Sequence, residues 1–199
     1  APLPTRMNSY FEKQTELDAA KQRYIAAADL EMEAWAAKVA ALPDIWVTPR
    51  LEDYDLPTFG ANNGANLYPQ EDGSFLVTGM IENKTHYIMM LNSKLNGITG
   101  IRVEAMTDEM LPKLGPGWAN GNFVLTELYV ESASLKDVNS LRTNPVERAW
   151  ADYSQPEFPV SAAMDGVTAK GGWAIDMPGL ATHAVDRCAV FVMKDDIGY

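Results

Sequence analysis

The first part of the chain carries apolar residues at spacings of three and four, which is the period of an amphipathic helix. Ser9 and Glu12 have the spacing of a capping box, and Pro43 ends the pattern. The sequence therefore predicts one long helix over residues 9–42. Its apolar stripe consists of Leu17, Ala20, Tyr24, Ala28, Met32, Trp35, Val39 and Leu42. We interpret this stripe as a packing seam, either for the rest of this chain or for another part of a longer protein.

Residues 43–73 are interrupted by prolines, glycines and turn signals such as Asn62-Asn63-Gly64. We expect a long surface connection here, with short strands near residues 45–47 and 66–68. From Ser74 onward the apolar period changes from 3.6 to 2, which is typical of strands. The pattern predicts strands at residues 75–81, 86–91, 98–106 and 123–131, and weaker candidates at 146–153, 158–162, 172–175 and 187–193.

Short strands separated by turns, with no helices between them, favour an antiparallel sandwich. We therefore expect a mainly β fold, a β-sandwich of jelly-roll type preceded by a long N-terminal helix. The expected domains are a helical segment over residues 1–43 and a β-sandwich over residues 44–199. The stretch GPGWANGNFVLTELYV (115–130) is expected to supply the central strand, and its three glycines are expected to need special backbone angles.

Composition narrows the classes of partner. The net charge is 16 − 27 = −11, so the surface repels nucleic-acid backbones and anionic lipid. No apolar run approaches the roughly 18 residues of a membrane span. The single cysteine, Cys188, excludes an internal disulfide, and its apolar neighbours indicate a buried side chain. We expect neither nucleic acid nor a membrane span.

No catalytic motif is apparent, and we predict that the chain is not an enzyme. His86 and His183 lack partners at metal or triad spacing, and no phosphate loop or nucleophile elbow occurs. A glycosidase needs two carboxylates facing each other about 5–9.5 Å apart. Glu104 and Asp108 are the one pair we would nominate for that role.

Two carboxylates are candidates for a cation site. Glu127 lies within the predicted strand at 123–131, and Asp165 begins an Asp-Gly turn. Ca²⁺ prefers six to eight oxygen ligands, many of them loop carbonyls, and a carboxylate from a neighbouring strand would complete such a shell. The alternative is that Glu127 is solvated and Asp165 only starts a turn.

Three aromatic residues adjoin loops and are candidates for stacking on sugar rings: Trp118, Tyr153 and Trp173. The alternative is that they fill the core of the sandwich or its ends. We add Arg102 to the ligand-binding candidates. Arg102 and Glu104 lie on one face of the same predicted strand, where an ion pair between them is the simpler interpretation.

Several motifs resemble a domain of planctomycete surface or periplasmic proteins that accompanies cytochrome c modules. The resemblance covers roughly residues 46–191 and is most specific in the last motifs. The matching motifs are Asp72-Gly73-Ser74, Gly79, Tyr87, ITGIRVEAM (98–106), Asp108, Leu111-Pro112, GPG (115–117), NGNFVLTEL (120–128), ADYSQ (151–155), Asp165-Gly166 and GWAI (172–175). The family usually has an arginine after GPG, where this chain has Trp118.

The second half also resembles galactose-binding-like sandwiches of the discoidin type, which often serve as carbohydrate-binding modules. The shared order is Ala151 to Ser154, then Asp165-Gly166, then Trp173. In those domains a strand glutamate and the Asp-Gly loop help to hold a structural calcium. Glu127 would match that glutamate, but it precedes the loop here, which implies a permuted sandwich and strengthens the calcium hypothesis.

These resemblances imply a non-catalytic, carbohydrate-binding-like module of a larger extracytoplasmic protein, periplasmic or on the cell surface. The expected partners are a glycan and neighbouring domains of a longer chain. The family pattern continues past Phe191, so we expect a fragment or missing last strands. No haem attachment motif is present. The alternatives are a structural or protein-interaction scaffold and, third, an enzyme acting on polysaccharide.

Overall fold

The computed structural model describes residues 3–40, 46–50, 58–79, 84–176 and 184–198. The chain divides into two compact units, Ala1–Val47 and Thr48–Tyr199, and each is described by itself. The predicted domain boundary after residue 43 lies outside the described residues.

The first unit contains the helix α1 (Leu3–Ala40). It begins six residues before Ser9, so the predicted capping box is wrong: Ser9 and Glu12 lie inside the helix. Pro4 fits there because the first helical turn has no intrahelical use for the missing N–H. The side chains of residues 12–28 are exposed, Tyr24 at 78%. Among the described helices, none is long and apolar enough to cross a membrane.

The second unit is mainly β, as predicted, and all its described strand pairs are antiparallel. Among the described residues, the 3₁₀ turns η2 (Pro112–Leu114) and η3 (Val160–Ala163) interrupt the strands. The strands are β1 (Thr58–Ala61), β2 (Ala65–Pro69), β3 (Phe75–Gly79), β4 (Tyr87–Met90), β5 (Ile98–Ala105), β6 (Val124–Leu125), β7 (Glu131–Ser134), β8 (Asp137–Thr143), β9 (Val146–Ala151), β10 (Trp173–Ala174) and β11 (Arg187–Ile197).

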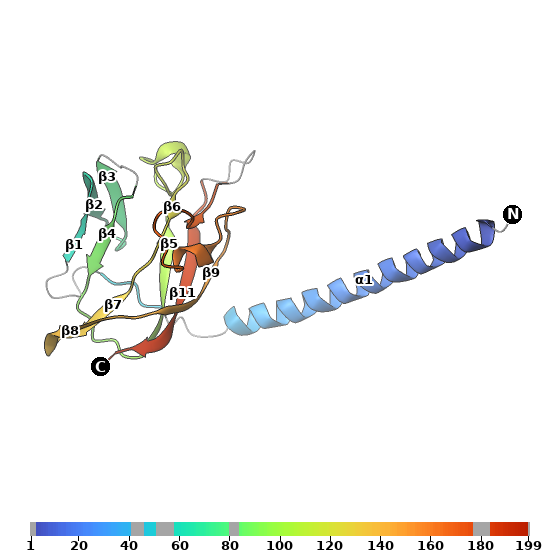
Figure 1. Cartoon of the computed structure of the whole chain (residues 1–199), viewed down its shortest axis with the longest axis horizontal. Helices are drawn as coiled ribbons and strands as arrows, with labels where there is room; N and C mark the ends of the chain where they lie inside the picture. Colours follow the sequence, from blue (N-terminus) through green and yellow to red (C-terminus); the bar gives the residue numbers. More distant parts are fainter. Residues whose placement is uncertain (1–2, 41–45, 51–57, 80–83, 177–183, 199) are drawn as a thin grey trace. The chain divides into compact units, whose positions relative to one another are not determined.

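The largest sheet has the order β5-β11-β9, and these three strands lie side by side in Figure 1. The other strands form two-stranded pairs: β1 with β4, β2 with β3, β7 with β8, and β6 with β10. On β11 the alternate residues Ala189, Phe191 and Met193 are buried, at 0%, 0% and 5% exposure. They form one core with residues of η3, β10 and the segment after β10, namely Val160, Ala163, Trp173 and Ile175.

The prediction of one central strand over residues 123–131 is wrong. Val124 and Leu125 pair with β10, and Glu131 already belongs to a different strand, β7. The backbone then leaves the ladder, since the N–H of Leu128 donates to the carbonyl of Ala163 in η3. The long central strand is β11 instead, because among the described strands it carries a buried alternate set and pairs on both sides.

Other differences are local. The predicted strand at 158–162 is mostly the 3₁₀ turn η3, because the carbonyl of Pro159 accepts from Ala162 within the turn itself. The hairpin of β7 and β8 was not predicted, since its strands carry mostly polar, exposed residues. Residues 46 and 47 are not in a strand. Residue 45 and the predicted strand end at 80–81 lie outside the described residues.

The glycine-rich loop before β6 owes its glycines mainly to close backbone approach. Of these three glycines, only Gly121 has a positive φ, at 92°, although special angles were predicted for all three. A Cβ on Gly115 would meet the backbone of Gly121, and one on Gly117 would meet the carbonyl of Asn122. Bridges from Gly117 to Gly121 and from Ala119 to Asn122 fold the loop into a tight hairpin.

We expect Gly117→Ala to lower the free energy of unfolding by about 1–3 kcal/mol, the usual cost of overpacking. Its new methyl group would lie inside van der Waals contact of backbone atoms that cannot move aside. Urea denaturation measures the change. Gly60→Ala is the control, since a Cβ there meets nothing within 4 Å. Equal stability of the two variants would contradict this account of the loop.

Candidate functional site

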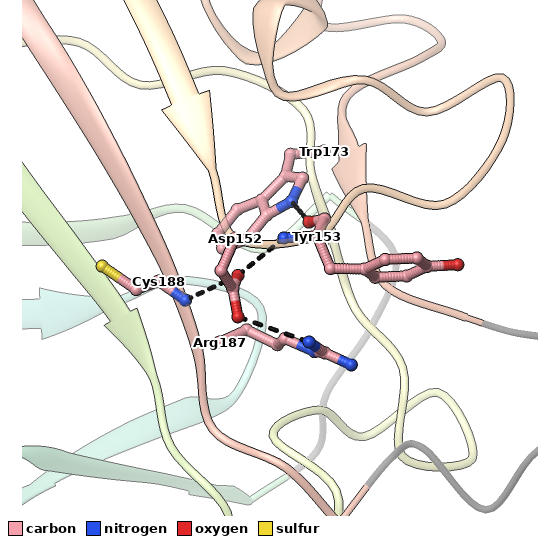
Figure 2. Close-up of polar contacts among 5 residues, drawn as sticks. All are labelled: Asp152, Tyr153, Trp173, Arg187 and Cys188. Atoms are coloured by element: carbon pink, nitrogen blue, oxygen red, sulfur yellow. Dashed lines mark hydrogen bonds and ion pairs between the residues drawn. The ribbon is translucent and has the colours of Figure 1, made fainter. Parts of the chain in front are cut away.

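A network of polar contacts joins the end of β9 to the start of β11 (Figure 2). The Asp152 carboxylate accepts hydrogen bonds from the backbone N–H groups of Tyr153 and Cys188, at 2.9 and 3.1 Å. Its other oxygen lies 3.3 Å from Nη1 of Arg187. The indole N–H of Trp173 donates to the carbonyl of Tyr153 at 2.8 Å. One aspartate therefore fixes the corner between the two strands.

Trp173 belongs to the core and was wrongly predicted as a ligand-binding residue. Its side chain is 0% exposed and packs edge-on against Phe123, with ring centroids 5.0 Å apart. A ring with no exposed surface cannot stack on a ligand. The indole needs its N–H satisfied because it is buried, and the carbonyl of Tyr153 supplies the acceptor.

Tyr153 is half-buried and packs against the same core. The guanidinium of Arg187 lies over the ring of Tyr153, 4.8 Å from the centroid. The Tyr153 hydroxyl donates a hydrogen bond to the carbonyl of Asp176 at 3.3 Å. Arg187 therefore covers one face of the ring that was predicted to stack on a sugar. Among the described residues, the buried Nε of Arg187 has no hydrogen-bond partner.

Trp118 lies at the tip of the glycine-rich hairpin and is 37% exposed. Its indole N–H donates to the carbonyl of Val77 in β3 at 2.9 Å. This bond fastens the hairpin to β3 and fixes the orientation of the ring. Of the three predicted aromatic residues, Trp118 offers the most exposed ring, but it also has this structural role.

Arg102, the fourth predicted ligand residue, forms the expected ion pair with Glu104. Its Nε lies 2.9 Å from a carboxylate oxygen of Glu104, two residues along β5. The two side chains are 28% and 46% exposed, so the pair is only partly shielded from water. Such a pair stabilises the fold little, and both side chains remain accessible to a ligand.

The register of the largest sheet brings Arg102 into line with a residue that the sequence analysis did not select. Arg102 pairs with Val190 of β11, which pairs with Trp150 of β9. Directly opposed residues in antiparallel strands share a face. Because Ala189 and Phe191 point into the core, this row points away from it. The outer face of the sheet is defined here by Arg102, Glu104, Val190, Arg148 and Trp150.

Trp150 is exposed at 54%, more than any other tryptophan whose side chain the structure describes. The guanidinium of Arg148 lies over its ring, 5.5 Å from the centroid, as Arg187 lies over the ring of Tyr153. Arg148 is also paired with Glu147 at 3.4 Å. Glu147 sits where the register between β9 and β11 shifts, so it is the extra residue of a bulge. The arrangement combines an exposed aromatic ring with polar groups beside it.

A shallow depression of about 260 Å³ adjoins Trp150 at the edge of the sheet. Residues 147–150 of β9 line one side of it, and Ser161 and Met164 line the other. The signal that would have found this site is the alternation in VERAWA (146–151). Its small residues Ala149 and Ala151 pack inward, so Arg148 and Trp150 must point outward.

Cys188 lies on the same side of the sheet, opposite Glu104. In Figure 2 its side chain points away from the Tyr153 ring and the Trp173 indole. Burial raises the pKa of its thiol above the ordinary value; the nearby Arg102 lowers it, and Glu104 and Asp152 raise it further. The thiol is therefore protonated and poorly nucleophilic at neutral pH.

The structure brings together Glu127 and the Asp165-Gly166 turn, as the sequence analysis expected. The carboxylate of Glu127 accepts a hydrogen bond from the N–H of Gly166 at 2.8 Å. Asp165 accepts one from the N–H of Val167, also at 2.8 Å. Direct bonds therefore hold this turn. Within the described residues, no three His, Cys, Asp or Glu side chains gather in a way that could hold a metal.

The remaining candidates have local partners. The backbone N–H of His86 donates to the side chain of Asn62 at 2.7 Å, and His183 lies outside the described residues. Asp108 accepts from the N–H of Met110 at 2.8 Å, as a turn-forming aspartate does. The nominated pair of Glu104 and Asp108 thus consists of one ion-paired and one turn-forming carboxylate.

Comparisons with family models, curated proteins and solved structures found no match to this chain. The resemblance to planctomycete domains and to discoidin-type sandwiches therefore stays a prediction.

Calcium at Glu127 and Asp165 also stays a prediction, and it has a direct test. We expect CaCl₂ added to chelator-treated protein to raise the melting temperature, because an ion that binds only the folded state stabilises it. At 100 times the dissociation constant the gain is about 2.7 kcal/mol. Asp165→Asn should abolish the shift, and MgCl₂ is the ionic control. An unchanged melting temperature would end the calcium hypothesis.

Proposed function

We propose that this chain is a non-catalytic carbohydrate-binding module of a larger extracytoplasmic protein, and that the outer face of its largest sheet binds the glycan. The observation that carries the proposal is Trp150, an exposed aromatic ring beside an arginine and a carboxylate on the outer face of the sheet. The extracytoplasmic location and the larger parent protein rest on the resemblance to planctomycete surface domains.

The chemistry of the outer face suits a sugar. An aromatic ring offers a broad apolar surface to the C–H face of a pyranose, and it loses little side-chain entropy on binding. Hydroxyl groups donate and accept hydrogen bonds, so they match guanidinium donors and carboxylate acceptors. Arg102 lies two strands from Trp150, about 10 Å away by ordinary strand spacing, which is the reach of two to three sugar units.

We further propose that the second unit is a sandwich of the jelly-roll, galactose-binding-like class. In support, residues of β6, β10 and η3 pack in one core with the inward-pointing residues of the β5-β11-β9 sheet. Polysaccharide cleavage is the weaker alternative, because Glu104 is ion-paired and Asp108 forms a turn.

Trp150→Ala should lower the affinity for a bound polysaccharide about tenfold or more, as expected when a central tryptophan is truncated. The measurement is isothermal titration with ligands first identified on a glycan array. Because Trp150 is 54% exposed, the variant should keep the wild-type melting temperature.

Tyr129→Ala is the matched control, since Tyr129 is 63% exposed and lies outside the face. Trp118→Ala distinguishes the two candidate sites: it should lower stability by removing the bond to Val77 while leaving affinity nearly unchanged. Loss of binding in Trp118→Ala but not in Trp150→Ala would move the site to the hairpin. Flat titrations across neutral and sulfated polysaccharides would contradict glycan binding itself.

A second candidate function is a scaffold domain that docks a neighbouring domain of a longer chain. It is favoured by β4, whose four residues are all exposed although they are large and apolar: Tyr87, Ile88, Met89 and Met90. A strand in a finished monomer normally buries one of its two faces. Exposed apolar surface of this kind is typical of an interaction site.

If β4 docks a neighbouring domain, its backbone amides should exchange with solvent more slowly in the parent protein than in this chain alone. Hydrogen–deuterium exchange measures this difference, and the exposed hairpin of β7 and β8 is the internal control. Equal exchange of β4 in both samples would contradict the scaffold function.

A further inference from the structure

We propose that the outer face selects uncharged glycans and discriminates against sulfated or uronate-rich ones. This inference rests on the carbohydrate-binding function proposed above and adds the class of ligand. It follows from how the arginines of the face are paired and from the charge of the chain around them.

Each arginine of the outer face has a carboxylate beside it. Arg102 lies 2.9 Å from Glu104, and Arg148 lies 3.4 Å from Glu147. The formal charge of these four groups is therefore zero. A polyanionic ligand is usually recognised by a cluster of unopposed arginines or lysines, which form bidentate bonds to sulfate or carboxylate. The outer face does not present such a cluster.

The carboxylates also set a rule for which ligand atoms fit. An ionised carboxylate only accepts hydrogen bonds, and so do sulfate and uronate oxygens. An anionic group that approaches Arg102 or Arg148 thus also comes close to Glu104 or Glu147. The two negative groups repel each other, and neither can donate a hydrogen bond to the other. A sugar hydroxyl can donate to the glutamate and accept from the arginine at the same time, so it satisfies both members of the pair.

The surroundings add to this preference. The whole chain carries a net charge of −11. A field of that sign slows and weakens the association of an anionic polymer, and salt screens the effect.

The test compares matched pairs of polysaccharides that share a backbone, such as dextran with dextran sulfate and hydroxyethyl cellulose with carboxymethyl cellulose. Binding of the whole chain is measured by isothermal titration at low and at high salt. We expect the neutral member of a bound pair to bind about tenfold more tightly at low salt, because like charges oppose the other member. The ratio of the neutral to the anionic affinity should become smaller at high salt, because salt screens the repulsion.

A double variant tests whether the face itself makes the selection. Glu104→Gln with Glu147→Gln removes the carboxylate charge beside each guanidinium group and should narrow the neutral-to-anionic ratio of affinities by about tenfold. Glu71→Gln with Glu109→Gln changes the net charge equally, at exposed turn residues that are not part of the defined face, and should leave the ratio of affinities close to that of the wild type.

The outcomes separate this inference from the proposed function. Tighter binding of the sulfated or carboxymethylated member in wild-type protein would overturn the charge preference and leave glycan binding standing. An equal change of the neutral-to-anionic affinity ratio in both double variants would also overturn the inference, because the selection would then come from net charge alone. No binding to any polysaccharide of either class would overturn the proposed function itself.

Discussion

The pleat of β11 is the constraint on which the rest of the second unit depends. Successive side chains of a strand point to opposite sides, so Ala189, Phe191 and Met193 enter the core while Cys188 and Val190 point away from it. Pairing on both sides passes this alternation to β5 and β9. The core and the outer face are therefore two consequences of one register. A slip by one residue would exchange them.

Asp152 holds that register at the end of the sheet. It bonds the backbone at Cys188, and its own N–H donates to the carbonyl of the same residue at 3.0 Å. At the same corner Asp152 pairs with Arg187. The carbonyl of the next residue, Tyr153, accepts the hydrogen bond from the indole of the buried Trp173. The corner thus couples the position of β9 to the packing of the core, and it determines where Trp150 stands on the face.

Several residues that look like functional-site residues instead form hydrogen bonds or close contacts between segments far apart in the chain. Trp118 bonds β3, and Glu127 bonds the turn at Gly166. Gly172, with a φ of 118°, lets the chain pass close to the backbone of Leu125, where a Cβ would collide. A body made of short two-stranded pairs has few long ladders, and contacts of this kind replace them. Unusual residues in its loops are therefore first explained by structure.

The sequence alone determined the kinds of local structure. Alternation in ITGIRVEAM and RCAVFVM predicted β5 and β11, because the period of two is a property of consecutive residues. The nearness of Glu127 to the Asp-Gly turn was also anticipated, through a resemblance to a known type of site. The start of the long helix was predicted less well, since a polar residue such as Ser9 suits both a cap and a helix interior.

Only the tertiary structure decided which aromatic residues are accessible. The sequence around Trp118, Trp150 and Trp173 does not distinguish their environments. In the structure Trp118 holds a hairpin to β3, Trp150 is exposed on a sheet, and Trp173 is fully buried. The difference arises from pairing between residues 40 or more positions apart, as when Trp150, Val190 and Arg102 form one row. A local pattern fixes which side of a strand a residue takes, but the neighbouring strands determine whether that side is core or surface.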